Sequence, residues 1–343
     1  MSLSVGIVGG SGYTGGELLR LLHTHPEAEV TQITSRGAAG SYVYQTHPPM
    51  RAVSRLKFVH PDALEPCDVL FLCLPHGVSS ANIDQYAELA PTLIDLSADF
   101  RLEDATTYEQ WYGAAHTAPE WLPRFVYGLP EHNREQLRHA NYASGVGCNA
   151  TVMNLALLPL ARENWLESVV AAIKVGSSEA GADANAASHH PVRSGAVRTY
   201  APTNHRHSAE VAQVLRTQAR VHMSVTAIEM VRGIHLTAHV YLNREVQERD
   251  IWKLYRSVYK HEPFIRFVNQ RTGLHRLPEP RTVAGTNYAD IGFAVDEDDP
   301  THLVLMAALD NLVKGAAGSA VQSMNLMLGL EETYGLEFTG VYP

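Results

Sequence analysis

The sequence predicts an α/β fold in two domains, the first a parallel sheet wrapped by helices and the second built on an antiparallel or mixed sheet. Three observations support this prediction. The chain has 343 residues, more than the roughly 250 to 300 at which a single hydrophobic core stops growing. Its first part alternates short apolar strands with helical segments, which is typical of a parallel sheet. After about Thr151 the segments become long and strand-rich, which favours antiparallel or mixed pairing.

The first domain opens with a strand, a glycine-rich turn and a helix in residues 3–26, "LSVGIVGGSGYTGGELLRLLHTHP". The leucines at 18, 19, 21 and 22 share one helical face, and the helix must end before Pro26. A second strand follows in "EVTQITS" (29–35). Two further strands, "DVLFLCLP" (68–75) and "PTLIDLSAD" (91–99), flank the helix-compatible "GVSSANIDQYAELA" (77–90).

The second domain is predicted from its apolar runs, which are "SVVAAIKVG" (168–176), "VHMSVTAIEMVRGIHLTAHVYL" (221–242) and "HLVLMAALD" (302–310). The helix-like stretch "GAAGSAVQSMNLMLGLEETYG" (315–335) would return to the first domain. We therefore expect domains at residues 1–147 and 148–314, with the C-terminal stretch at about 315–343 packing on the first.

Composition narrows the class of protein. The chain is 45% hydrophobic and 18% charged, its longest apolar runs are too short to cross a membrane, and no signal peptide opens it. We expect a soluble, cytoplasmic protein. Its three cysteines do not have zinc spacing, so no metal site is predicted.

The formal net charge of −9 argues against nucleic-acid binding. Residues 188–207 nevertheless carry three arginines, four histidines and no acid, a composition that suits a local anion site.

The glycine-rich turn predicts a dinucleotide site. The pattern Gly10-x-Gly12-x-x-Gly15 lies between a strand and a helix, where glycine lets the backbone approach a pyrophosphate at the positive helix end. NAD-specific sites carry an acid about 20 residues further on, but here the second strand ends in Thr34, Ser35 and Arg36. Hydroxyl and guanidinium donors favour NADP, unless Arg36 is merely a solvated surface residue.

Cys148 has the surroundings of a nucleophile. It follows Gly147 and begins a helical pattern, and a helix N-terminus stabilises a thiolate. Cys67 and Cys73 lie in or beside apolar strand sequence and are expected in the core. A nucleophilic cysteine needs a proton-transfer partner, and the candidates are His205 and His207 in the basic stretch.

Together, a cysteine, NADP and an anion site suggest one class of reaction. A thiolate attacks an activated acyl group, a thioester forms, and hydride from the cofactor reduces it to an aldehyde. A nearby arginine would bind a phosphate leaving group.

Several motifs then occur in one order along the chain: "VGIVGGSGYTGGELLRLL", "SADFR", "YGLPE", "GCNAT", "HRHSAEV", "GTNYADIGF" and "DNLVKGAAGSAVQ". In this order they resemble the N-acetyl-γ-glutamyl-phosphate reductases and their close relatives. The resemblance implies a Rossmann NADP domain and an α/β catalytic and dimerisation domain, as in semialdehyde dehydrogenases, and a homo-dimer or homo-tetramer.

The resemblance also implies roles for individual residues. Cys148 would form the thioester, and His207 would be the acid/base, with His205 the less favoured candidate. The cofactor contacts implied are Ser11, Gly12, Tyr13 and Thr14 at the pyrophosphate, Ser35 and Arg36 at the 2′-phosphate, and Asn311 near the nicotinamide. Asn311 would otherwise be a helix-cap residue.

One departure points to a branch of this family. The arginine-pathway enzymes usually show Pro-Gly-Cys, then an aromatic residue, Pro and Thr, whereas here Val146 precedes Gly147 and Asn149-Ala150 follow the cysteine. "GCNAT" and the basic stretch resemble the lysine-pathway branch, which reduces 2-aminoadipate 6-phosphate while its amino group is attached to a small acidic carrier protein of the LysW type.

In this interpretation four residues would meet the substrate or the carrier: Asn149, Arg193, Arg198 and Arg206. The negative overall charge opposes docking of an acidic carrier, so the basic stretch would have to form a local patch.

Three alternative functions stay open from the sequence. They are the same chemistry on free N-acetylglutamyl phosphate in arginine synthesis, an aspartate-semialdehyde dehydrogenase, and a non-catalytic NADP-binding sensor.

Overall fold

The computed structural model describes residues 2–342. Contacts within the chain divide it into two units, one formed by residues 2–146 with 316–337 and the other by residues 147–315 with 338–342. The division falls one residue from each of the two boundaries expected from the sequence. Residues 338–342 contact the second unit, whereas the sequence analysis placed the whole C-terminal stretch with the first.

The first unit contains a seven-stranded sheet in the order β3-β2-β1-β4-β5-β7-β6. All of its strand pairs are parallel, because helical crossovers return the chain to the same edge each time. The strands are β1 (Leu3–Val8), β2 (Ala28–Thr34), β3 (Phe58–Val59), β4 (Val69–Leu72), β5 (Thr92–Asp95), β6 (Phe125–Tyr127) and β7 (Tyr142–Ser144).

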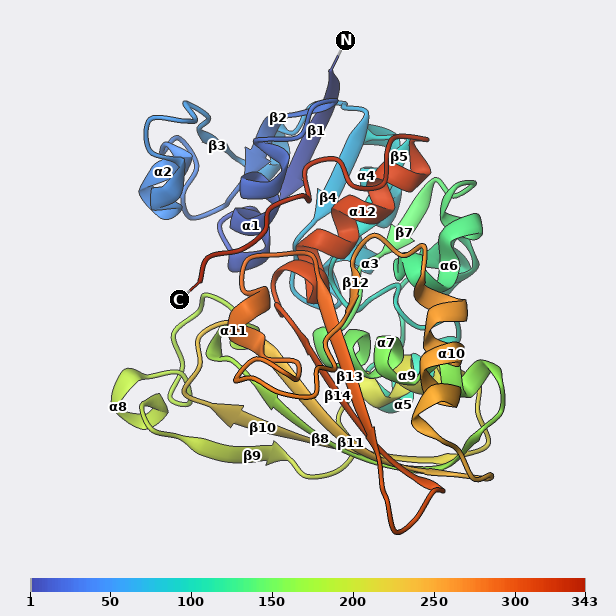
Figure 1. The fold of residues 1–343 in the computed structure, drawn as a ribbon. Coiled ribbons are helices and arrows are strands. Elements are labelled where there is room, and N and C mark those ends of the chain that lie inside the picture. Colours follow the sequence, from blue (N-terminus) through green and yellow to red (C-terminus); the bar gives the residue numbers. More distant parts are fainter. Residues whose placement is uncertain (1, 343) are drawn as a thin grey trace. The chain divides into compact units, whose positions relative to one another are not determined.

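Helices cover this sheet. The last helix, α12, packs against β5, α1 and α6 and so belongs to the first unit (Figure 1). The helices of this unit are α1 (Tyr13–Leu22), α2 (Val43–Thr46), α3 (Val78–Ala81), α4 (Ile83–Leu89), α5 (Ala105–Tyr112), α6 (Pro130–Leu137) and α12 (Gly318–Met327), with short 3-10 turns η1 (Pro48–Met50), η2 (Pro61–Ala63) and η3 (Pro119–Arg124).

The strand order of this sheet reverses beside β1, since β2 lies on one side of it and β4 on the other. In open α/β sheets, ligands bind at the carboxyl ends of strands at such a switch point. The glycine-rich turn leaves the carboxyl end of β1, so the topology places it where a dinucleotide binds.

The second unit contains a mixed seven-stranded sheet in the order β12-β13-β14-β11-β8-β10-β9. The pairs β8–β10 and β12–β13 are parallel and the other four are antiparallel. The strands are β8 (Leu166–Val175), β9 (Val197–Ala201), β10 (Arg220–Ile228), β11 (Ile234–Leu242), β12 (Ile265–Phe267), β13 (Ala289–Val295) and β14 (His302–Leu309).

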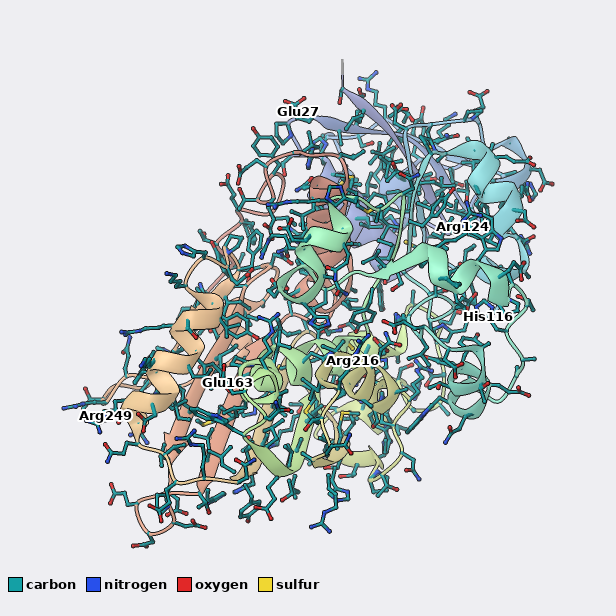
Figure 2. The ribbon with its side chains drawn as sticks, turned by 90° about the vertical axis from the view of Figure 1, so that its right-hand side faces the viewer. Glu27, His116, Arg124, Glu163, Arg216 and Arg249 are labelled. Carbon is teal, nitrogen blue, oxygen red and sulfur yellow. The ribbon has the colours of Figure 1, made fainter. Side chains whose placement is uncertain are left out.

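Helix α7 (Cys148–Arg162) is the centre of the second unit. Every residue from Asn149 to Ala161 is buried, because α7 packs on the sheet strands and also against α9 and α10. Glu163 follows the last residue of α7, and Arg216 follows α9 with a left-handed backbone (Figure 2). The remaining helices are α8 (His190–Arg193), α9 (His207–Leu215), α10 (Glu248–Tyr259) and α11 (Pro280–Val283), with the short turns η4 (Ser177–Ala180) and η5 (Val313–Ala317).

The predicted fold class is confirmed: a parallel α/β sheet is followed by a mixed sheet. Two predicted helices differ in extent. The helix expected over 77–90 is divided into α3 and α4 at Asn82, whose φ of −128° is not helical and whose side chain donates to the Val78 carbonyl. Only Gly318–Met327 of the last predicted stretch is α-helical.

Among residues 2–342, no helix is long and apolar enough to cross a membrane.

Candidate active site

Cys148 is the first residue of α7, and Gly147 is its N-cap. Cys148 is partly exposed as a residue, and it stands where the N–H groups of the first helical turn create a positive potential. Gly315 backs the cysteine, since a Cβ on that glycine would lie 2.7 Å from the Cβ of Cys148.

The carboxylate of Glu210 fixes the turn that leads into the cysteine. Glu210 lies in α9 and is fully buried, and its Oε2 accepts a 2.8 Å hydrogen bond from the Gly147 N–H. Gly147 must be a glycine for this approach, because a Cβ there would collide with Glu210 and would lie 2.8 Å from His207 Nε2. The packing of α9 on α7 therefore brings Glu210 and His207 against the residue before Cys148.

His207 begins α9 and is only 5% exposed. Its Nε2 lies 3.9 Å from Oε1 of Glu210, close enough for the carboxylate to stabilise a protonated imidazole. Histidine and glutamate three residues apart share one helix face.

His205 has a different environment. Its ring meets the ring of His207 edge to face at 4.6 Å, and its Nδ1 accepts a hydrogen bond from the His207 N–H. Burial, and then the charge of Arg206, lower the pKa of His205 to about 4, so it is neutral at pH 7. It lacks the carboxylate neighbour that His207 has in Glu210.

A second carboxylate, Glu179 in η4, lies in the same region. Its Oε1 accepts a 2.5 Å hydrogen bond from the Tyr200 hydroxyl of β9. Burial raises the pKa of Glu179, although Tyr200, Asn149, Arg193 and Arg206 favour its charged form. Burial, the Glu179 carboxylate and the neighbouring Cys148 also raise the pKa of Tyr200, so Glu179 and Tyr200 belong to the surroundings of the cysteine.

Asn149 is fully buried beside this carboxylate. Neither Oδ1 nor Nδ2 completes a hydrogen bond of good geometry with another residue in the described part of the chain. Buried amides are nearly always hydrogen-bonded in folded proteins. The Asn149 amide therefore suits a polar group supplied by a substrate.

The structure distinguishes Arg193 from Arg198, two of the three arginines of the basic stretch. Arg193 lies at the end of α8, where it acts on the Glu179 carboxylate and donates to the Val175 carbonyl. Arg198 lies on β9, where it is half-exposed and donates to the Ala187 carbonyl. The structure brings Arg193 together with Cys148, Asn149, His205, Arg206 and His207. Among the described residues, the Arg198 side chain bonds to Ala187 and makes no hydrogen bond or ion pair to this group.

Asn311 is almost fully buried and uses both ends of its amide on the protein. Its Oδ1 accepts from the Gly233 N–H at 2.8 Å, and its Nδ2 donates to Ser178 Oγ at 2.9 Å. These bonds tie the loop before β11 to η4. A cofactor contact from Asn311 would have to share these groups.

In the first unit, the predicted pyrophosphate residues form the turn between β1 and α1. The N-cap of α1 is Gly12, which offers no side-chain cap, and the first turn contains no acid, so these N–H groups are available to an anion. Gly15 permits close packing within the turn, since a Cβ there would lie 2.5 Å from the Gly10 Cα. The turn fits a dinucleotide phosphate.

Ser35 and Arg36 follow β2. The hydroxyls of Ser35 and Ser11 are 3.1 Å apart, which joins the ends of β2 and β1. Arg36 is exposed. Burial raises the pKa of Tyr86 in α4, and the positive charge of Arg36 partly offsets this rise. An exposed guanidinium beside two hydroxyls suits a phosphate on the adenosine ribose.

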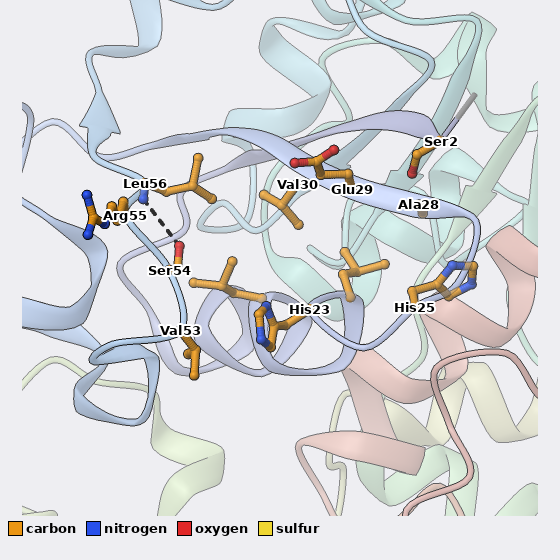
Figure 3. A pocket seen from close by; sticks show the side chains of 12 residues that line it. Ser2, His23, His25, Ala28, Glu29, Val30, Val53, Ser54, Arg55 and Leu56 are labelled. Carbon is orange, nitrogen blue, oxygen red and sulfur yellow. Dashed lines mark hydrogen bonds between the residues drawn. The ribbon is translucent and has the colours of Figure 1, made fainter.

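A pocket of about 680 Å³ also occurs in the first unit, between α1, the first half of β2 and residues 53–56 (Figure 3). It is lined by Leu19, Leu22 and Val30 together with polar groups such as His23 and Arg55. None of the predicted site residues lines it.

Sequence reasoning assigned no role to Glu210, Glu179 or Tyr200. Glu210 was detectable in principle, because a carboxylate three residues after a candidate histidine faces the same side of a helix. Glu179 and Tyr200 had no such signal, since only the folding of η4 and β9 brings them near the cysteine.

Comparisons with known proteins identify the class. The model of the semialdehyde dehydrogenase NAD-binding domain matches residues 4–140, and that of the semialdehyde dehydrogenase dimerisation domain matches residues 148–311. The LysW-L-2-aminoadipate 6-phosphate reductase of Deinococcus radiodurans is 46% identical over 99% of this chain and 98% of its own. A Thermomicrobium roseum protein that carries this name provisionally is 53% identical over the full length of both chains.

A third relative is the LysW-L-2-aminoadipate/LysW-L-glutamate phosphate reductase of Saccharolobus solfataricus, 43% identical over 99% of this chain and 98% of its own. The fold and the matched models define the class as the semialdehyde dehydrogenases. Within that class, the chain belongs to the family of the LysW-L-2-aminoadipate 6-phosphate reductases.

Solved structures agree on the fold. Aspartate semialdehyde dehydrogenase II of Vibrio cholerae, complexed with ASA, matches with a TM-score of 0.75 at 15% identity over 96% of this chain and 99% of its own. The aspartate semialdehyde dehydrogenase of Candida albicans, solved with NADP, matches with a TM-score of 0.70 at 13% identity over 96% of this chain and 99% of its own.

Proposed function

We propose that this protein reduces L-2-aminoadipate 6-phosphate to the semialdehyde, releasing phosphate, while the amino group of the substrate is attached to a small acidic carrier protein of the LysW type. NADPH is the proposed reductant, and lysine biosynthesis the proposed pathway. The observation that carries the proposal is the grouping of Cys148, His207 and Glu210 in a chain 43–53% identical to reductases named for this substrate.

In this proposal Cys148 is the nucleophile. Its sulfur attacks the acyl carbon, the bond from that carbon to the phosphate oxygen breaks, and a thioester and free phosphate result. The position of the sulfur at the start of α7 supports this step, because the helix end stabilises the attacking thiolate. When bound, the nicotinamide supplies the hydride that converts the thioester to the aldehyde.

His207 is the proposed acid/base. It accepts the thiol proton as the sulfur attacks, and it returns a proton when the aldehyde leaves and the thiol forms again. Glu210 stabilises the protonated imidazole from 3.9 Å. His205, with a pKa of about 4, cannot hold a proton near pH 7 and is the weaker candidate.

The polar groups around Glu179 are proposed to bind the substrate. The aminoadipyl group carries a free carboxylate, an amide where it joins the carrier, and the phosphate. The guanidinium groups of Arg193 and Arg206 suit the anions, and the buried amide of Asn149 suits the substrate amide. Arg198 on β9 is proposed to meet the acidic carrier.

The cofactor proposed is NADPH rather than NADH. The turn of Ser11, Gly12, Tyr13 and Thr14 would hold the pyrophosphate, and Ser35 and Arg36 would hold the 2′-phosphate. The absence of an acid at Thr34, Ser35 and Arg36 supports this choice. Asn311 is proposed to lie near the nicotinamide. Its amide would then share its groups between the cofactor and the two hydrogen bonds to Gly233 and Ser178.

A homo-dimer or homo-tetramer is also proposed. The second unit matches a dimerisation-domain model, and Val170 and Tyr241 are 51% and 40% exposed on its sheet strands. Apolar side chains at such positions support burial against a second copy.

The test measures oxidation of NADPH with two acyl phosphates made in situ, one the carrier-bound aminoadipyl phosphate and the other free N-acetylglutamyl phosphate. We expect strong preference for the carrier-bound substrate and slow reaction with NADH. Preference for the free substrate would replace this proposal with the arginine-pathway reaction. No oxidation of either nucleotide would favour a non-catalytic NADP-binding protein.

A further inference from the structure

Outside the residues assigned so far, His47 donates a hydrogen bond to the dinucleotide turn. His47 lies between α2 and η1, and its Nε2 is 2.8 Å from the carbonyl oxygen of Gly10. Because a carbonyl oxygen only accepts hydrogen bonds, Nε2 must carry the proton. We propose that His47 is a positioning residue that holds the glycine turn in the conformation that binds the cofactor pyrophosphate, an inference that rests on the proposed dinucleotide cofactor.

Two hydrogen bonds hold Gly10 from opposite sides. The N–H of Gly10 is fixed by the Thr34 carbonyl of β2 at 2.9 Å, and its carbonyl is fixed by His47. In a trans peptide the C=O and the next N–H point in opposite directions. By holding the Gly10 carbonyl, His47 therefore directs the N–H of Ser11 away from the imidazole and sets the start of the turn.

The imidazole also packs on the first turn of α1. A Cβ on Gly16 would lie 2.6 Å from Cε1 and Nδ1 of His47, so the ring covers the helix backbone where a larger residue would exclude it. Gly16 itself closes the first helical turn, since its N–H donates to the Gly12 carbonyl at 3.0 Å. His47 thus contacts the turn at Gly10 and the helix at Gly16, on either side of the residues proposed to hold the pyrophosphate.

His47 is itself held firmly. Its N–H donates to the Val43 carbonyl at 2.8 Å, and its carbonyl accepts from the Met50 N–H at 2.9 Å. Its ring lies 6.1 Å from that of Phe58. A donor anchored in this way can orient a flexible glycine turn before a ligand arrives, which lowers the entropy lost on binding.

The experiment uses the full-length enzyme and two ligands that share the adenosine 2′-phosphate. NADPH contains the pyrophosphate, and adenosine 2′-monophosphate does not. Affinity for NADPH is measured by fluorescence titration without substrate, and affinity for the monophosphate by competition. His47→Met removes the donor while keeping bulk, His47→Gln keeps an N–H at similar reach, and His23→Gln, at an exposed histidine next to α1, is the matched control.

We expect His47→Met to weaken NADPH binding about fivefold, the effect of one lost hydrogen bond, with adenosine 2′-monophosphate binding unchanged. His47→Gln should restore NADPH binding, and His23→Gln should resemble the wild type. Equal loss of both ligands, undiminished NADPH binding in His47→Met, or failure of His47→Gln to restore it would overturn the proposal.

Circular dichroism checks each variant for folding, and His47→Asn, too short to reach Gly10, replaces His47→Met if the latter does not fold. A failure of the proposed function would give a different result. The wild-type protein would then bind neither ligand, or it would bind NADPH normally but not reduce the acyl phosphate.

Discussion

Two histidines two residues apart have opposite properties at this site. His207 faces the buried carboxylate of Glu210, whereas His205 is partly buried against the rings of Tyr200 and His207 and lies near the positive charge of Arg206. A general acid/base is most effective when its pKa lies near the operating pH, and a pKa of about 4 places His205 far from neutral pH. The surroundings of the two rings, and not their order in the sequence, therefore favour His207.

This difference predicts unequal effects of matched substitutions. His207→Asn should lower kcat by about 10²- to 10⁴-fold, the usual effect of losing a general base. His205→Asn should lower kcat by less than about tenfold, since it removes a packing and hydrogen-bonding group only. Steady-state kinetics with the carrier-bound substrate measures both, and equal losses, or no loss in either variant, would contradict the assignment.

At the residue scale the sequence predicted that Cys148 begins a helix, as it does. It also named His205 and His207 as candidate proton-transfer partners from one short motif, and these roles stay predictions. It did not name Glu210, although the spacing of three residues from His207 was visible in the sequence. That Glu210 also binds the Gly147 N–H depends on the packing of α9 on α7. Glu179 and Tyr200 were also missed, since they are 21 residues apart in sequence and meet only through the path of β9.

At the scale of elements, several of the proposed site residues lie at helix starts. Cys148 opens α7, His207 opens α9, and Gly12 caps α1. The sequence predicted α1 well, because its leucines share one face, and it predicted the start of α7 from the helical pattern that follows Gly147. It did not predict the division of 77–90 at Asn82 or strand β9, whose residues are mostly exposed and have no clear alternation.

A buried aspartate at the carboxyl end of β5 should make the free energy of unfolding depend on pH. Asp95 is fully buried, and burial, followed by the charge of Asp99, raises its pKa to about 7. In the unfolded chain the value is about 4, so the folded state binds this proton more tightly. The contribution of Asp95 to the free energy of unfolding is therefore fully present below about pH 4, and it is lost as the pH rises through about 7.

Asp95→Asn removes this titration. Between pH 4 and 7 the free energy of unfolding should fall less with rising pH in the variant than in the wild type, although other groups add their own slopes to both. Urea unfolding at a series of pH values measures the difference. Parallel curves for the two proteins would mean that Asp95 is not protonated at neutral pH in the folded state.

At the scale of the whole molecule, charge opposes the proposed partner. The formal net charge is −9, so an acidic carrier is repelled over most of the surface, and docking requires a local cation. Arg198 on β9 is the half-exposed candidate. The sequence predicted this basic stretch but not the separation of Arg198 from Arg193.

Arg198→Ala should raise the KM for the carrier-bound substrate about three- to fivefold at low salt, with kcat unchanged and the difference shrinking as salt screens the charge. The KM for a free acyl phosphate should not change. Arg249→Ala is the matched control, because Arg249 is 80% exposed on α10 (Figure 2) and its loss changes the net charge equally. If both variants behaved alike, Arg198 would have no docking role.

The central claim is that Cys148 carries the acyl group, and one measurement tests it most directly. The enzyme is mixed with carrier-bound aminoadipyl phosphate without nicotinamide cofactor, quenched in acid, and analysed for released phosphate and for peptide mass. We predict a burst of about one phosphate per active chain and an acyl group on the Cys148 peptide, both absent in Cys148→Ala. A phosphate burst in Cys148→Ala, or an acyl group on another residue, would contradict the account.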